Sequence, residues 1–137
     1  MNTRVRASLW FLVVSGGVVG VWALFFPQAF YDSFPGLGLS WVSVDGPFNE
    51  HLVRDVGGGY LSLAVVTLVA VVYRTRELAL AVALGWLVAQ LPHFSYHMYH
   101  LDMYPALIDK IGNMVTLALL VLVPAYVLAQ TLRGNSG

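Results

Sequence analysis

The chain has 137 residues, of which 58% are hydrophobic and only 10% carry a formal charge. Soluble globular domains carry about a quarter charged residues, so this composition predicts an integral membrane protein with four spans and short connections. The net charge of zero gives no indication of nucleic-acid binding. The absence of cysteine excludes disulfides, iron–sulfur clusters and thiol nucleophiles.

The first span is predicted at about residues 8–26, because this apolar run lacks the small-residue cleavage site of a signal peptide and Pro27 ends it. Gly16 and Gly20 have the spacing that lets another helix approach closely in lipid. Residues 27–47 are rich in proline, glycine and aromatic side chains. We expect them to form an outer loop, which either anchors at the lipid–water interface or covers the mouth of the bundle.

The second span is predicted at about residues 48–73, and its outer end is charged. Glu50 and Arg54 are four residues apart, as are His51 and Asp55, so each pair can interact along one helix face. A lone charge near the hydrocarbon edge is costly. We therefore predict an ion pair between Arg54 and one of three acids, namely Asp55, Asp102 or Asp109.

Two further sequence features indicate close contacts between spans. Three successive glycines, residues 57–59, suit a place where another helix or a ligand comes very close. The tight connection at residues 74–77 makes the second span and the third, at about 78–100, antiparallel neighbours. A fourth span is predicted at about 105–132, giving an all-α antiparallel up-down bundle.

The third span ends in a polar stripe. Gln90, His93, His97 and His100 share one helix face. A hydrocarbon core takes about 20 residues, which places Gln90 and His93 below the outer surface. Polar groups at that depth usually face the protein interior, so we expect His93 to face the second and fourth spans and to hydrogen-bond Gln90 or Asn113.

Charge sets the predicted orientation. Five arginines lie on the side of the termini and only Arg54 and Lys110 on the other. The positive-inside rule then predicts a multi-pass protein of the cytoplasmic (inner) membrane, with both termini in the cytoplasm. All four histidines and six of the seven acids fall on the outer half. This asymmetry argues against a conduction path, which needs polar lining throughout, and favours a pocket that opens outward.

The candidate binding or polar-network residues are His51, Arg54, Asp55, Gln90, His93, His97, Asp109 and Asn113. They allow several interpretations. A metal can bind His93 and His97 with His51 or Asp109 as a further ligand, although the HExxH pattern is absent because Phe94 replaces its glutamate. A b-type haem can lie between His51 and one of the other two histidines.

Two further interpretations involve no metal. A quinone or lipid headgroup can occupy a pocket in which histidines and acids move protons. Alternatively, the polar groups satisfy one another and only fix helix register, or the surface binds another protein. The aromatic residues Trp41, Tyr96, Tyr99 and Tyr104 are most simply read as an interfacial belt.

Three landmarks carry a family resemblance: residues 30–36 (FYDSFPG), residues 47–57 (PFNEHLVRDVG), and Pro92 followed by the three histidines of the stripe. With four spans, the chain resembles small bacterial membrane proteins that are DoxX-like in outline. The resemblance implies a four-helix fold. Some members of that family are associated with quinone-linked oxidoreductases, or act as accessory subunits and chaperones of larger membrane proteins.

The predicted function is therefore a non-catalytic accessory subunit or ligand-binding module with an outward-facing histidine pocket. The alternative is a redox protein that binds metal, haem or quinone at the His93 and His97 stripe. Expected partners are membrane lipids and either a larger membrane complex or further copies of the chain.

Overall fold

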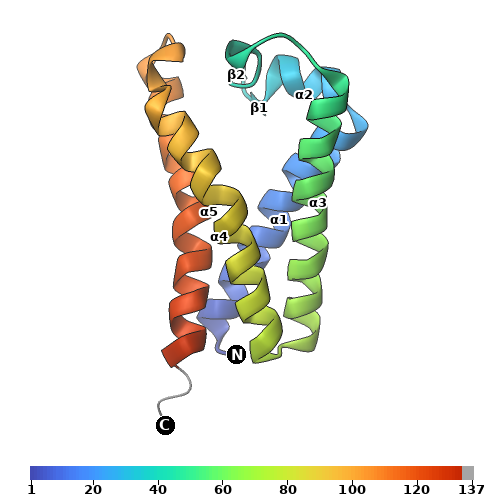
Figure 1. The fold of residues 1–137 in the computed structure, drawn as a ribbon, viewed down its shortest axis with the longest axis vertical. Helices are drawn as coiled ribbons and strands as arrows, with labels where there is room; N and C mark the ends of the chain where they lie inside the picture. The colour runs from blue at the N-terminus through green and yellow to red at the C-terminus, as the bar shows by residue number, and fades with distance from the viewer. Residues whose placement is uncertain (134–137) are drawn as a thin grey trace.

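The computed structural model describes residues 1–133, and four long helices dominate it (Figure 1). Each is long and apolar enough to cross a membrane, so the all-α membrane fold is confirmed. The elements in chain order are α1 (Thr3–Phe25), α2 (Pro27–Ser33), β1 (Pro35–Gly36), β2 (Leu39–Ser40), η1 (Ser43–Asp45), α3 (Glu50–Tyr73), α4 (Arg76–Tyr99), η2 (Leu101–Met103) and α5 (Leu107–Arg133).

Side-chain caps set where three of the long helices begin. Asn2, Asn49 and Thr75 accept hydrogen bonds from backbone N–H groups in the first turns of α1, α3 and α4. The helix α1 begins at Thr3 rather than near residue 8. The Asn2 cap lies before the apolar run, so the first turn, which carries two arginines, is also helical. The helix α3 ends at Tyr73, and the residue that caps it, Arg74, has a left-handed φ of 57°.

The bundle consists of two antiparallel pairs, α1 with α3 and α4 with α5. Glycines bring the first pair together: a Cβ on Gly20 would lie 2.6 Å from the backbone N of Leu61, and one on Gly57 would overlap the backbone of Leu24. The predicted close packing at Gly20 is thus confirmed. Of the three successive glycines only Gly57 is a contact, since nothing lies within 4 Å of a Cβ on Gly58 or Gly59.

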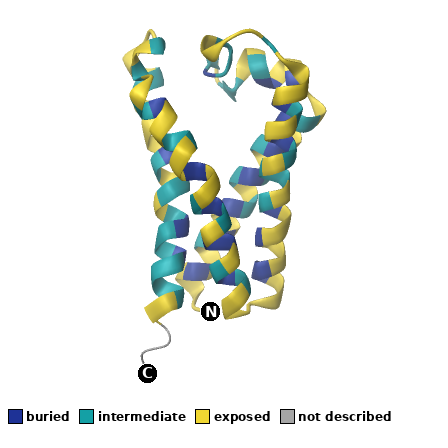
Figure 2. Cartoon of the chain, in the orientation of Figure 1, coloured by how far each residue is buried: buried dark blue, intermediate teal, exposed yellow. Residues whose placement is uncertain are grey.

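The two pairs meet near the chain termini and diverge toward the other end (Figure 1). We call these the terminal end, which also holds the turn between α3 and α4, and the loop end, which holds α2, the β1–β2 hairpin and η2. Buried residues concentrate where the pairs meet (Figure 2). The main core there includes Leu9, Leu12, Ala83, Trp86 and Val127, all with 0% exposure.

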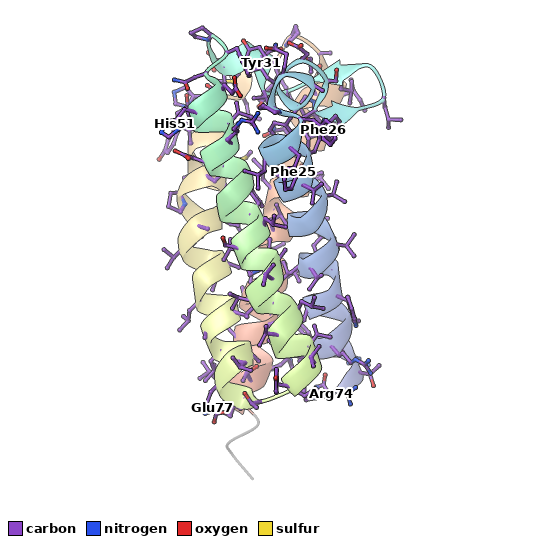
Figure 3. All side chains as sticks on the ribbon, turned by 90° about the vertical axis from the view of Figure 1, so that its right-hand side faces the viewer. Phe25, Phe26, Tyr31, His51, Arg74 and Glu77 are labelled. Carbon is purple, nitrogen blue, oxygen red and sulfur yellow. The ribbon has the colours of Figure 1, made fainter. Side chains whose placement is uncertain are left out.

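A smaller cluster lies at the loop end, where Phe30 of α2 packs on Ala23 and Val53. Charged and polar side chains lie at both ends. Arg74 and Glu77 lie at the terminal end, whereas His51 lies at the loop end, as Figure 3 shows. Outward-facing aliphatic side chains cover the long helices between them, as expected for surfaces in contact with lipid.

Candidate functional site

A cavity of about 240 Å³ lies at the loop end between the two helix pairs. Leu52 and Val56 line it and are also 60% and 40% exposed, so the cavity opens past α3. Its walls combine apolar and aromatic groups with a few polar ones, the usual composition of a small-molecule site. The lining side chains that carry the argument below are Phe30, Phe34, Trp41, Asp45, Tyr60, His93, His97, Tyr104, Asn113, Thr116 and Leu117.

Three buried side chains form a hydrogen-bonded chain in the cavity wall. Asn113 Nδ2 donates to Tyr104 Oη at 3.0 Å, and Tyr104 Oη lies 3.0 Å from His97 Nδ1. The phenol of Tyr104 thus links Asn113 of α5 to His97 of α4, and the His97 tautomer decides whether Tyr104 Oη donates to Nδ1 or accepts from it.

Tyr104 is suited to this role because it is only 1% exposed. Burial raises the pKa of the Tyr104 phenol to about 12, with the carboxylates of Asp45 and Asp109 adding to the effect. The phenol thus keeps its proton at neutral pH. The predicted interfacial belt is wrong for Tyr104 and for Trp41, since both are buried. Tyr99 is 85% exposed, as a belt residue should be.

Asn113 holds the most unusual atom of the site. The residue is 4% exposed, and its Oδ1 is buried without a hydrogen-bond partner. Buried polar atoms in native proteins are nearly always paired. Leaving one unpaired costs about 1–3 kcal/mol, so Asn113 Oδ1 is the least well satisfied buried side-chain atom among residues 1–133.

His93 lines the cavity, and its ring centroid lies 4.7 Å from that of His97. The expected hydrogen bond from His93 to Gln90 or Asn113 is not formed. Gln90 instead accepts from Tyr60 Oη at 3.2 Å, and the Asn113 amide is taken by Tyr104. Within residues 1–133 His93 has no hydrogen-bond partner, which leaves its ring nitrogens available to a molecule in the cavity.

Residues 34–45 cover the loop end of the cavity. Trp41 is 7% exposed; its Nε1 donates to Asp109 Oδ1 at 2.9 Å, and its ring packs over Gly112 of α5. Tyr96 Oη of α4 donates to Asp45 Oδ1 at 2.8 Å. We call residues 34–45 the cover segment. It links the α1–α3 pair to both helices of the other pair. This is the arrangement expected if the loop covers the mouth of the bundle.

Other predicted site residues lie elsewhere. His51 and Asp55 pair at 3.4 Å on the surface of α3, turned away from the face that lines the cavity. His51 therefore cannot join His93 and His97, either as a metal ligand or across a haem. Among residues 1–133 no group of three or more histidine or acidic side chains is arranged to hold a metal ion.

The predicted ion pair between Arg54 and Asp55, Asp102 or Asp109 is wrong. Arg54 pairs with Glu50 at 2.8 Å along its own helix and donates to the carbonyl oxygen of Leu24. The last carbonyls of a helix lack partners within it. Because α3 packs closely on α1 at Gly57, the carbonyl of Leu24 lies within reach of this guanidinium.

No protein family, curated protein or solved structure matches the chain. The functional argument therefore depends on the geometry of the loop-end cavity. Sequence reasoning found His93, His97 and Asn113 from their helical spacing. It did not single out Asp45 or assign Trp41 and Tyr104 to the site, although the small Gly112, one turn from Asp109, was a signal for a bulky neighbour.

Proposed function

We propose that the protein is a non-catalytic ligand-binding module of a membrane, which holds a small lipid-soluble molecule in the loop-end cavity. The cavity between the helix pairs carries this proposal, because it is lined by His93, whose ring has no hydrogen-bond partner among residues 1–133. The exposed residues at the opening, Leu52 and Val56, are both apolar, which favours entry of the ligand from the bilayer rather than from water.

The polar groups of the cavity favour binding over catalysis. Asp45 and Asp109 accept hydrogen bonds from Tyr96 and Trp41, so both carboxylates help to fix the cover segment. His97 is held by Tyr104. A second candidate is a quinone-linked redox role, favoured by the free ring of His93 beside a cavity open to lipid; a redox-dependent change in bound quinone would support it.

The cellular setting is part of the proposal. Five arginines at the terminal end favour a cytoplasmic location for both termini in a cytoplasmic membrane. The resemblance to DoxX-like proteins favours an accessory role in a larger membrane complex or a homo-oligomer. A reporter fused after residue 137 should be active only in the cytoplasm, and activity on the outer side would contradict this orientation.

A pair of substitutions on α5 tests the binding function. Leu117 lines the cavity and is 7% exposed, whereas Leu119 is 42% exposed and faces outward. Leu117→Trp should fill the cavity and Leu119→Trp should not. Solvent extraction and mass spectrometry of the purified proteins should recover a stoichiometric small molecule from the wild type and from Leu119→Trp only. Equal recovery from both variants, or none from the wild type, would contradict the proposal.

A further inference from the structure

We infer that a second cavity, at the terminal end of the bundle, binds a phosphate group. This cavity has a volume of about 260 Å³ and lies where the turn that joins α3 to α4 meets the start of α1 and the last turn of α5. Its lining includes Arg74, Arg76, Gln130 and Thr131, and it shares no residue with the loop-end cavity. The inference therefore concerns a separate site and does not depend on the proposed binding function.

The charge of this cavity is positive and uncompensated. Arg74 and Arg76 line it, and no aspartate or glutamate among residues 1–133 does. The two ion pairs within residues 1–133 lie in the first turns of α3 at the loop end, so neither of these arginines is paired with an acid there. A cavity that presents two unpaired guanidinium groups attracts an anion.

The hydrogen-bond donors of the cavity suit a phosphate group. Arg76 Nε donates to the carbonyl oxygen of Thr131 at 3.3 Å, which leaves the terminal N–H groups of its guanidinium for a ligand. The side chains of Arg74 and Gln130 form no hydrogen bond among residues 1–133. Guanidinium groups bind phosphate through paired hydrogen bonds. A phosphate monoester has three strong acceptor oxygens, so one phosphate can pair with both arginines and with the Gln130 amide.

The backbone at Arg74 supports a role for its side chain in binding. The residue that follows a helix in the left-handed conformation is usually glycine, because a side chain is disfavoured at a positive φ. Arg74 has a φ of 57° at this position. An arginine there is less favourable for the turn than a glycine, and a bound anion gives its guanidinium a function that the fold does not.

The position of the cavity favours a lipid as the source of the phosphate. The cavity lies at the ends of helices that are long and apolar enough to cross a membrane, and Figure 3 shows Arg74 at this end. Lipid headgroups lie at the level where such helices end, and basic pockets between the ends of spans bind anionic headgroups. Free inorganic phosphate has the same chemistry, so the two sources need separate probes.

Matched probes test the inference on the full-length protein in detergent. Dioctanoyl phosphatidic acid and dioctanoylglycerol differ only in the phosphate group. The rise of the unfolding midpoint with probe concentration gives the affinity of each. The phosphatidic acid should bind at least about tenfold more tightly, the value of one hydrogen bond to a charged group. Inorganic phosphate that stabilises the protein equally well would assign the site to free phosphate, and a weaker effect would assign it to a lipid headgroup.

Three variants locate the bound phosphate. Arg74→Gly removes a guanidinium and relieves the positive φ, so it should weaken binding of phosphatidic acid about tenfold while it keeps or raises the unfolding midpoint without ligand. Arg76→Gln should weaken binding to a similar extent. Arg4→Gln is the matched control, because it removes the same charge from an exposed residue of α1 that does not line the cavity. It should leave binding almost unchanged.

Two results would overturn the inference. One is equal binding of phosphatidic acid and dioctanoylglycerol to the wild type. The other is an equal loss in Arg4→Gln and Arg74→Gly, which would show attraction by overall charge alone. Leu117→Trp, which fills the loop-end cavity, should keep the preference for phosphatidic acid; its loss there would place the lipid at the wrong end. The wild-type comparison needs no variant, so the test holds even if a variant does not fold.

Discussion

Buried polar groups differ in their hydrogen bonding between the two ends of this bundle. At the terminal end, Trp86 and Thr67 are both 0% exposed, and Trp86 Nε1 donates to Thr67 Oγ1 at 2.9 Å. At the loop end, Asn113 is almost as buried but leaves one oxygen without a partner beside a cavity. The terminal end thus pairs its buried polar groups within the fold, whereas the loop end leaves a cavity of the kind that the proposed binding function requires.

The ends are also held together differently. At the terminal end large side chains such as Leu9 and Trp86 fill the space between the helix pairs. At the loop end the helix pairs are spread, and the cover segment links them through the hydrogen bonds of Trp41 to Asp109 and Asp45 to Tyr96. Dense packing tolerates little change, whereas a site closed by a few hydrogen bonds can open to admit a ligand.

The largest effect should follow from removing the central side chain of the terminal end. Trp86→Ala should lower the free energy of unfolding by about 3–5 kcal/mol, the usual cost of deleting a buried aromatic side chain. Trp10 is 42% exposed and faces outward, so Trp10→Ala is the matched control and should cost far less. Thermal or denaturant unfolding in one detergent measures both, and similar losses would show that this end is not the stabilising core.

A second pair of variants compares the two buried polar groups directly. Thr67→Val strands the Trp86 N–H and should cost about 1–3 kcal/mol. Asn113→Leu removes an oxygen that has no partner together with one hydrogen bond to Tyr104, which keeps its bond to His97. This variant should change the ligand-free stability by less than about 1 kcal/mol. If Asn113→Leu were the more damaging change in ligand-free protein, the contrast between the ends would fail.

How much of the structure can be predicted from the sequence depends on the kind of contact. Hydrophobic runs located the four helices, and helical spacing placed His93 and His97 on one face. The partner of Trp41 is 68 positions away, and no local periodicity indicates such a pairing. Tyr104 lies between two spans, where an aromatic residue is typical of an interface, so its place between His97 and Asn113 was not predicted.

The error at Arg54 has a different physical cause. Its partner across the helix interface is the backbone carbonyl of Leu24, a group that every residue carries. A sequence pattern therefore points to acidic side chains and cannot show that a helix end will supply the acceptor. The ion pair between Arg54 and Glu50, four residues apart, was predictable from spacing alone.

The smallest effect is expected at this arginine. Arg54 and Glu50 are both substantially exposed, and Arg76 similarly donates to a carbonyl, that of Thr131, at 3.3 Å. Exposed ion pairs contribute about 0–1 kcal/mol, so Arg54→Leu and Arg76→Leu should each cost no more than about 1 kcal/mol. Unfolding midpoints in the same detergent compare them, and a loss several times larger for Arg54→Leu would mean that its pairing matters more than its exposure indicates.

The most direct test of the contrast uses the absence of natural cysteine. Ala83 in the terminal core and Leu117 in the cavity wall are 0% and 7% exposed, so both are buried by the same measure. N-ethylmaleimide, a small membrane-permeant reagent, should label Leu117→Cys readily and Ala83→Cys hardly at all, and 4-bromophenol, a small lipid-soluble molecule, should slow the first reaction. Equal protection of the two variants would contradict the account, because the loop end would then be as closed as the terminal end.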